Sequence, residues 1–165
     1  VWRARRAEAA VEPLRREDRV ELVLRRREAV AVGVRVGPRE GRSTLVFFLS
    51  PTCPICKKLI PVLRSVREVE GRWLDVVLAS DGDEERQKTF IAKAGLQSFP
   101  YALSTDLGVT YRVSRLPFAV LIDPAGIVRA KGLINNREQL ESLFNASEMG
   151  VASIQTFLEP NPAHP

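Results

Sequence analysis

Two cysteines separated by two residues, Cys53 and Cys56, are the side chains in this sequence best suited to chemistry. The 165 residues contain no other cysteine, so a fold held by several disulfides is excluded. A close pair of this kind indicates thiol–disulfide exchange, in which a thiolate attacks a disulfide sulfur, or metal binding.

Other interpretations of the pair stay open at this point. A structural zinc site needs about four ligands, and the sequence adds only His164, far away in the tail. One chain therefore does not complete a zinc site, although a soft metal held between molecules is an alternative. Two packed core cysteines without chemistry are another alternative, which their place between a strand and a helix makes less favourable.

The surrounding pattern places the pair where a strand meets a helix. The continuous apolar run 45–49 predicts a strand buried on both faces, and apolar residues at helical spacing predict a helix over 54–70 that ends at Gly71. Unpaired backbone N–H groups at a helix N-terminus favour a thiolate, and Pro54 suits the first helical position. We expect Cys53 to attack and the more buried Cys56 to resolve the mixed disulfide.

Two further features of this helix bear on the site. Lys57 and Lys58 follow the second cysteine, and a nearby ammonium lowers a thiol pKa, although solvated helix surface is the more common role of such lysines. Pro61 lies inside the predicted helix, where it removes one hydrogen bond and bends the axis.

The rest of the pattern predicts an α/β fold with a mixed sheet. Strand–helix–strand order implies parallel pairing, and a hairpin implies an antiparallel edge. A proline at 117 opens the second-to-last strand, with either isomer of the preceding bond allowed. The predicted elements are strand 73–79, a helix over 84–95 capped by Asp83, an extended piece at 99–103, helical turns at 106–113, hairpin strands 118–122 and 126–132, and a helix from Asn135 or Asn136 to about 145.

We divide the chain into a basic N-terminal segment 1–42, a domain over 43–148 and a tail over 149–165. The net charge of +5 comes from the first segment, which holds twelve arginines and seven acidic residues. Residues 20–24 and 29–34 suggest a hairpin in it, and a poorly ordered segment is the alternative. Nucleic-acid binding is not expected, because acidic residues alternate with these arginines and no aromatic side chains interleave for stacking. No apolar run of about 18 residues predicts a membrane span within these residues, and a span removed upstream stays open as an alternative.

Cys53-Pro54-Ile55-Cys56-Lys57, together with Pro61 and Leu116-Pro117, resembles the thioredoxin superfamily over roughly residues 43–147. The stretch 45–63 more narrowly resembles the MauD family of methylamine utilisation proteins, membrane-anchored periplasmic relatives of the TlpA/ResA type. The resemblance implies a thioredoxin-like three-layer fold, a central mixed sheet flanked by helices. It also implies that Pro117 is a cis-proline beside the cysteine pair and that the Leu116 backbone binds an extended substrate segment.

The resemblance further implies a function in the periplasm or cell envelope, with the Cys53–Cys56 disulfide as the redox-active group and no added cofactor. Its expected partners are a protein client with cysteines, for which the small subunit of methylamine dehydrogenase is the candidate, and a redox partner that supplies or accepts electrons. Thr52, Pro54, Ile55 and Lys57 are expected to support the two cysteines.

The sequence departs from the superfamily pattern at two positions near the cysteines. Phe47 stands where thioredoxin carries a buried carboxylate, and Thr52 replaces the usual tryptophan. Residues 1–42 also lack the alanine-proline and aromatic signature of the anchored relatives. A proton relay through a carboxylate is therefore not expected at position 47, and another group or water has to serve.

Two hypotheses result from these observations. The first is a dithiol–disulfide exchanger, whose direction the Pro-Ile dipeptide does not fix; the lack of a histidine between the cysteines favours reductase or isomerase behaviour. The second is a binding or chaperone module of the same fold, including metal delivery, without redox turnover. Thiol reactivity across pH distinguishes them.

Overall fold

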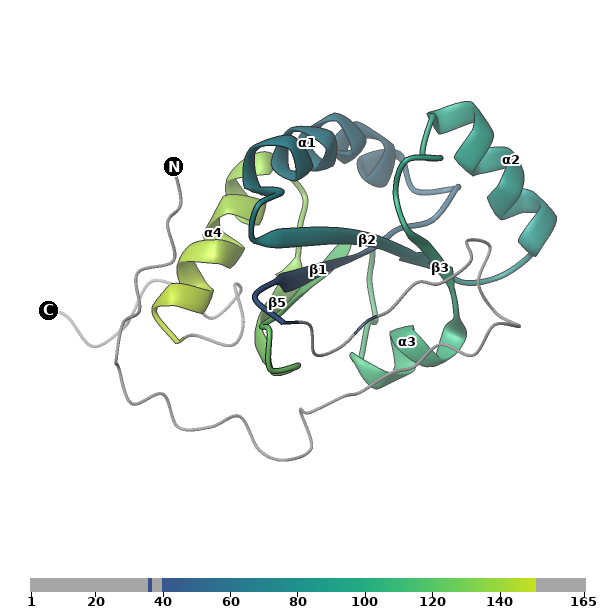
Figure 1. Ribbon diagram of the computed structural model, residues 1–165. Helices are drawn as coiled ribbons and strands as arrows, with labels where there is room; N and C mark the ends of the chain where they lie inside the picture. The colour runs from purple at the N-terminus through teal and green to yellow at the C-terminus, as the bar shows by residue number, and fades with distance from the viewer. Residues whose placement is uncertain (1–35, 37–39, 151–165) are drawn as a thin grey trace, which may run out of the picture.

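The computed structural model describes Val36 and residues 40–150 (Figure 1). Its described part forms five strands and four helices that alternate along most of the chain. In order, they are β1 (Ser43–Phe48), α1 (Pro54–Glu70), β2 (Leu74–Ser80), α2 (Glu84–Ala94), β3 (Tyr101–Leu103), α3 (Thr105–Thr110), β4 (Phe118–Ile122), β5 (Val128–Leu133) and α4 (Arg137–Glu148).

The five strands form one mixed sheet in the order β3-β2-β1-β4-β5. β1 pairs in parallel with β2, and β2 with β3, as the intervening helices require. β4 pairs antiparallel with both β1 and β5. The predicted α/β class with a central mixed sheet is therefore confirmed.

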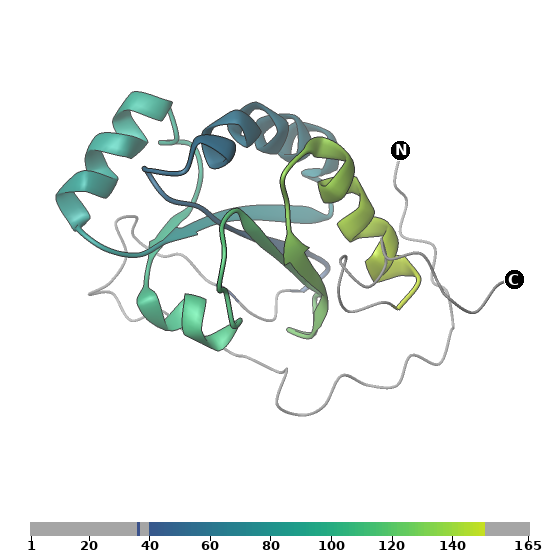
Figure 2. The ribbon, with the colours of Figure 1, turned by 180° about the vertical axis from the view of Figure 1, so that it is seen from behind.

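Helices cover both faces of this sheet, with α1, α2 and α4 on one face and α3 on the other (Figures 1 and 2). Residues along β1 alternate between the two faces, as the period of a strand dictates. Leu45 and Phe47 pack beneath α1 and α4, whereas Val46 and Phe48 pack against α3. Because both faces of the sheet are covered, residues 45–49 are all apolar, which is the pattern that predicted this strand.

Side-chain caps fix where the helices begin. The Asp83 carboxylate accepts a hydrogen bond from the Arg86 amide at 2.8 Å, which confirms the predicted cap of α2. Asn136 caps α4 in the same way, and this helix runs to Glu148, three residues beyond the predicted end. α3 starts at Thr105 and ends at Thr110, so the predicted span of 106–113 was too long at its C-terminal end.

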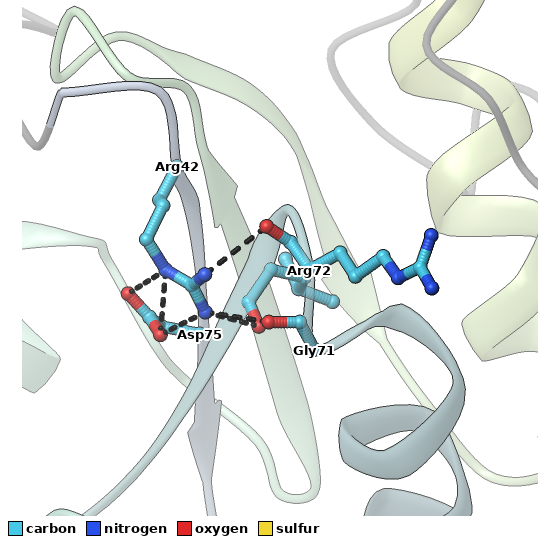
Figure 3. A network of polar contacts seen from close by, with 5 residues as sticks. Arg42, Gly71, Arg72 and Asp75 are labelled. Carbon is cyan, nitrogen blue, oxygen red and sulfur yellow. Dashed lines mark hydrogen bonds and ion pairs between the residues drawn. The ribbon is translucent and has the colours of Figure 1, made fainter.

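Arg42 connects the start of β1 to the turn between α1 and β2 (Figure 3). Its guanidinium donates to both carboxylate oxygens of Asp75 at 2.6–3.0 Å and to the carbonyls of Gly71 at 2.8 Å and Arg72 at 3.1 Å. The hydrogen bonding of the guanidinium to the Asp75 carboxylate raises the pKa of Arg42 above its usual value, so the charge is permanent. This cluster holds the C-terminal end of α1 in place, at the end of the helix away from the cysteines.

Parts of the sequence-based prediction lie outside the described residues. They include the hairpin suggested at 20–24 and 29–34, nearly all of the basic segment 1–42, and most of the tail 149–165. The division into segment, domain and tail stays a prediction. None of the helices between Pro54 and Glu148 is both long and apolar enough to cross a membrane.

Candidate active site

Cys53 is the N-cap residue of α1, immediately before Pro54. Its backbone is extended, with φ of −94° and ψ of 107°, and its Sγ accepts a hydrogen bond from the Cys56 amide at 3.2 Å. Pro54 occupies the first turn, where its missing N–H leaves no helical hydrogen bond unmade. The sulfur of Cys53 therefore takes the place of the usual capping oxygen and faces the positive end of the helix dipole.

The two cysteines form a disulfide, with their Cα atoms 5.2 Å apart. Their exposure differs: Cys53 is half-buried, whereas Cys56 is completely buried. Cys56 belongs to the cluster of apolar side chains between α1 and the sheet. An incoming sulfur can therefore reach Cys53 but not Cys56.

The loop before Cys53 is held by short polar contacts. The Cys53 amide donates to the Ser50 carbonyl at 3.1 Å, and the Thr52 amide donates to the Ser50 hydroxyl at 3.3 Å. The hydroxyls of Ser50 and Thr52 lie 3.0 Å apart. Thr52 and Ile55 are exposed beside the disulfide, so hydroxyl and aliphatic groups form this surface.

The Leu116–Pro117 bond is cis, as the family resemblance implied. Phe118, the first residue of β4, pairs with Phe48, the last residue of β1. Pro117 therefore lies at the same end of the sheet as Leu49, where β1 leads into the cysteine loop. Pro117 is buried and its carbonyl accepts from the Ile134 amide at 3.0 Å, while Leu116 is exposed. The sheet thus brings Leu116 and Pro117 to the end at which the disulfide lies, although about 60 residues separate them in sequence.

Phe47 is fully buried in the same apolar cluster as Cys56. Among the described residues, Glu70 is the only buried carboxylate, and it lies in the last turn of α1, where it accepts from the Trp73 indole N–H at 2.6 Å. The interior near Cys56 therefore offers apolar groups in place of a carboxylate. The structure also shows no group of three or more His, Cys, Asp or Glu suited to a metal within its described range.

Sequence reasoning missed a groove of about 800 Å³ between α1 and α2. Its floor includes Ile60 and Phe90, and Pro51 and Lys57 bring it up to the cysteine loop. The sequence pattern predicts both helices but singles out neither Ile60 nor Phe90, and no local pattern shows that the two helices leave a groove above these side chains.

The domain described as Thioredoxin-like matches residues 41–128, more than half of the sequence. The chain belongs to the thioredoxin-like family. This match spans the cysteine pair and the cis-proline, so the sequence and the geometry identify the same family.

Within this thioredoxin-like family, curated relatives extend the similarity. The MauD methylamine utilization protein of Methylobacillus flagellatus is 43% identical over 130 residues, covering 79% of this chain and 62% of the relative. The MauD protein of Paracoccus denitrificans is 42% identical over 127 residues, covering 76% and 62%. The resemblance to MauD is confirmed, and the chain spans about three fifths of the length of these relatives.

Solved structures show the same fold. StoA of Bacillus subtilis superimposes with a TM-score of 0.54 at 23% identity, over 65% of this chain and 85% of that one. The exposed lipoprotein thioredoxin of Streptococcus pneumoniae superimposes with a TM-score of 0.57 at 18% identity, over 64% and 86%. The thioredoxin-like three-layer arrangement is confirmed.

Proposed function

We propose that this chain is a protein thiol–disulfide oxidoreductase that works through Cys53 and Cys56. The observation that carries the proposal is the unequal exposure of a cysteine pair at a helix N-terminus. Cys53 is half-buried and Cys56 has no exposed surface. A pair of this geometry suits a two-step exchange in which only the first sulfur meets the client.

In the reducing direction, the Cys53 thiolate attacks one sulfur of a client disulfide. The client S–S bond breaks, its second sulfur leaves as a thiolate, and a mixed disulfide joins client and Cys53. Cys56 then attacks Cys53 Sγ, which releases the client as a dithiol and leaves the Cys53–Cys56 disulfide. Two electrons pass to the client, and the proton of Cys56 passes to the departing client sulfur or to water, since Phe47 provides no acceptor.

The oxidising direction is the reverse, starting from the disulfide form. A client thiolate attacks the half-buried Cys53 Sγ, and Cys56 leaves as the thiolate. A second client thiol then attacks the client sulfur of the mixed disulfide, which forms the client disulfide and releases Cys53 as a thiolate. In both directions the Cys56 amide, which donates to Cys53 Sγ at 3.2 Å, stabilises negative charge on Cys53.

Leu116 and Pro117 are proposed to bind the client chain beside the cysteines. Leu116 is exposed and precedes β4, whose first residue, Phe118, pairs with the last residue of β1 just before the cysteine loop. An extended client segment that hydrogen-bonds to the Leu116 backbone would place its cysteine near Cys53. Thr52, Ile55 and Lys57 form the surrounding surface, and Pro54 fixes the first turn.

The client is a protein with cysteines, and the small subunit of methylamine dehydrogenase is the candidate because several relatives are named methylamine utilization proteins. We place the reaction in the periplasm or cell envelope, with the full-length protein anchored to the membrane by a segment outside this chain. A redox partner restores the starting state, and the chemistry needs no cofactor besides the Cys53–Cys56 disulfide.

A trapping experiment tests this function. The Cys56→Ser variant should accumulate mixed disulfides with cysteine-bearing proteins through Cys53, detected as adducts on a non-reducing gel. The Cys53→Ser variant is the matched control and should trap far less, because Cys56 is buried. Equal trapping by the two variants would contradict the assigned roles, and two unreactive thiols would favour a binding module instead.

A further inference from the structure

The groove between α1 and α2 has an apolar floor that no described segment covers. The two helices lie side by side on one face of the sheet (Figures 1 and 2), joined by the Arg64 guanidinium, which donates to the carbonyls of Ala94 and Gly95 at 2.8 and 2.9 Å. Pro51, Ile60, Pro61, Phe90 and Ala94 supply the apolar lining. The volume of about 800 Å³ is enough for several amino-acid side chains.

Basic side chains dominate the rim of this groove. Lys57, Arg64, Arg86 and Lys93 line it, against a single acidic residue, Glu85. That carboxylate is already engaged by Lys88, at 2.9 Å. Among the residues that the structure describes, no carboxylate pairs with Lys57, Arg86 or Lys93.

The groove continues into the cysteine site. Pro51 lies two residues before Cys53, and Lys57 directly follows Cys56 along α1. From Lys57 to Arg64 the helix rises about 10 Å, the length of about three extended residues. In addition, Pro61 has no N–H to donate, so the Lys57 carbonyl does not receive the usual hydrogen bond from the residue four positions later in the helix.

We propose that this groove binds a segment of the client next to its reactive cysteine, in which an apolar side chain is flanked by acidic residues. This inference rests on the proposed function, since it assigns the specificity of the same site. The apolar side chain would fill the space above Ile60 and Phe90. The flanking carboxylates would meet Arg86 and Lys93, whose charges no described acidic residue neutralises.

Two synthetic peptides provide the test. Each carries one intramolecular disulfide and a leucine three residues from the cysteine, flanked by aspartates in one peptide and by lysines in the other. The protein should reduce the acidic peptide with a kcat/KM about tenfold higher than the basic one, and the difference should shrink as salt rises. The double variant Arg86→Glu/Lys93→Glu should reverse this preference, because it turns the rim from four basic and one acidic residue to two basic and three acidic residues.

The matched control is Arg72→Glu, which changes the sign of an exposed arginine at the other end of α1 and should keep the parent preference. Equal kcat/KM for both peptides, unchanged in the double variant, would overturn the groove assignment while exchange itself stands. Failure of the parent protein to exchange with either peptide, whether the peptide is offered as a disulfide or as a dithiol, would instead contradict the proposed function. If the parent protein sediments as a dimer and the double variant as a monomer, the groove binds a second copy of the chain, which would overturn the inference.

Discussion

Replacing Arg42 tests whether contacts distant from the cysteines hold the fold that positions them. The guanidinium binds Asp75 and two turn carbonyls at once (Figure 3), and the two side chains are 31% and 22% exposed. Hydrogen bonds to charged groups contribute about 1.5–3 kcal/mol to stability. Because both side chains are partly exposed, we expect the contribution of this cluster near the lower end of that range. We therefore expect Arg42→Ala to lower the free energy of unfolding by about 2 kcal/mol.

The assay is urea unfolding of the disulfide form, followed by circular dichroism. At about 4 °C per kcal/mol, the corresponding fall in Tm is about 8 °C. The free energy of unfolding of Arg42→Lys should lie between those of Arg42→Ala and the parent, because one ammonium cannot bind the Asp75 carboxylate and the turn carbonyls together.

Arg72→Ala is the comparison variant, since this side chain points away from Asp75 (Figure 3) and is exposed. Its effect should stay within about 0.5 kcal/mol. If Arg42→Ala lowered the free energy of unfolding no more than Arg72→Ala does, the contacts of Arg42 would not stabilise the fold, which would refute the reasoning from their geometry.

Three further predictions concern stability. Tyr101→Phe should lower the free energy of unfolding by about 1–2 kcal/mol, because it leaves buried Gln87 without the 2.6 Å hydrogen bond from the phenol; a smaller loss in a urea titration would contradict this. Burial raises the pKa of Tyr111 to about 12, so the folded state keeps a proton that the unfolded state loses near pH 10. Stability should therefore fall from pH 10 to 12, and urea titrations should show a shallower fall in Tyr111→Phe. Asp123→Ala removes acceptors for two turn amides and for Arg129, so it should lower Tm by about 4–8 °C in a thermal scan, and an unchanged Tm would show the turn to be self-sufficient.

The elements next to the cysteines were predictable because local signals agree. The predicted helix 54–70 coincides with α1, since proline at its first position and glycine after its last both match the helical period. The predicted strand 45–49 corresponds to β1, which starts two residues earlier at Ser43. A parallel register with β2 extends this strand into residues that carry no apolar pattern.

Other features depend on contacts between distant segments, so no local pattern could reveal them. The isomer of the Leu116–Pro117 bond was not determined by the residues alone and came only from the family resemblance. Arg42 and Asp75 meet across 33 positions because β1 and β2 pair in parallel. The groove above Phe90 likewise depends on how two helices pack on the sheet.

The proposed exchange depends most on the ionisation of the Cys53 sulfur at the start of α1. Alkylation of the reduced Cys56→Ser protein by iodoacetamide, measured from pH 5 to 10, reports the fraction of thiolate directly. Because the Cys56 amide and the helix dipole face Cys53, the apparent pKa of its thiol should lie clearly below the reference of about 8.5. An apparent pKa at or above that reference would contradict the proposed mechanism.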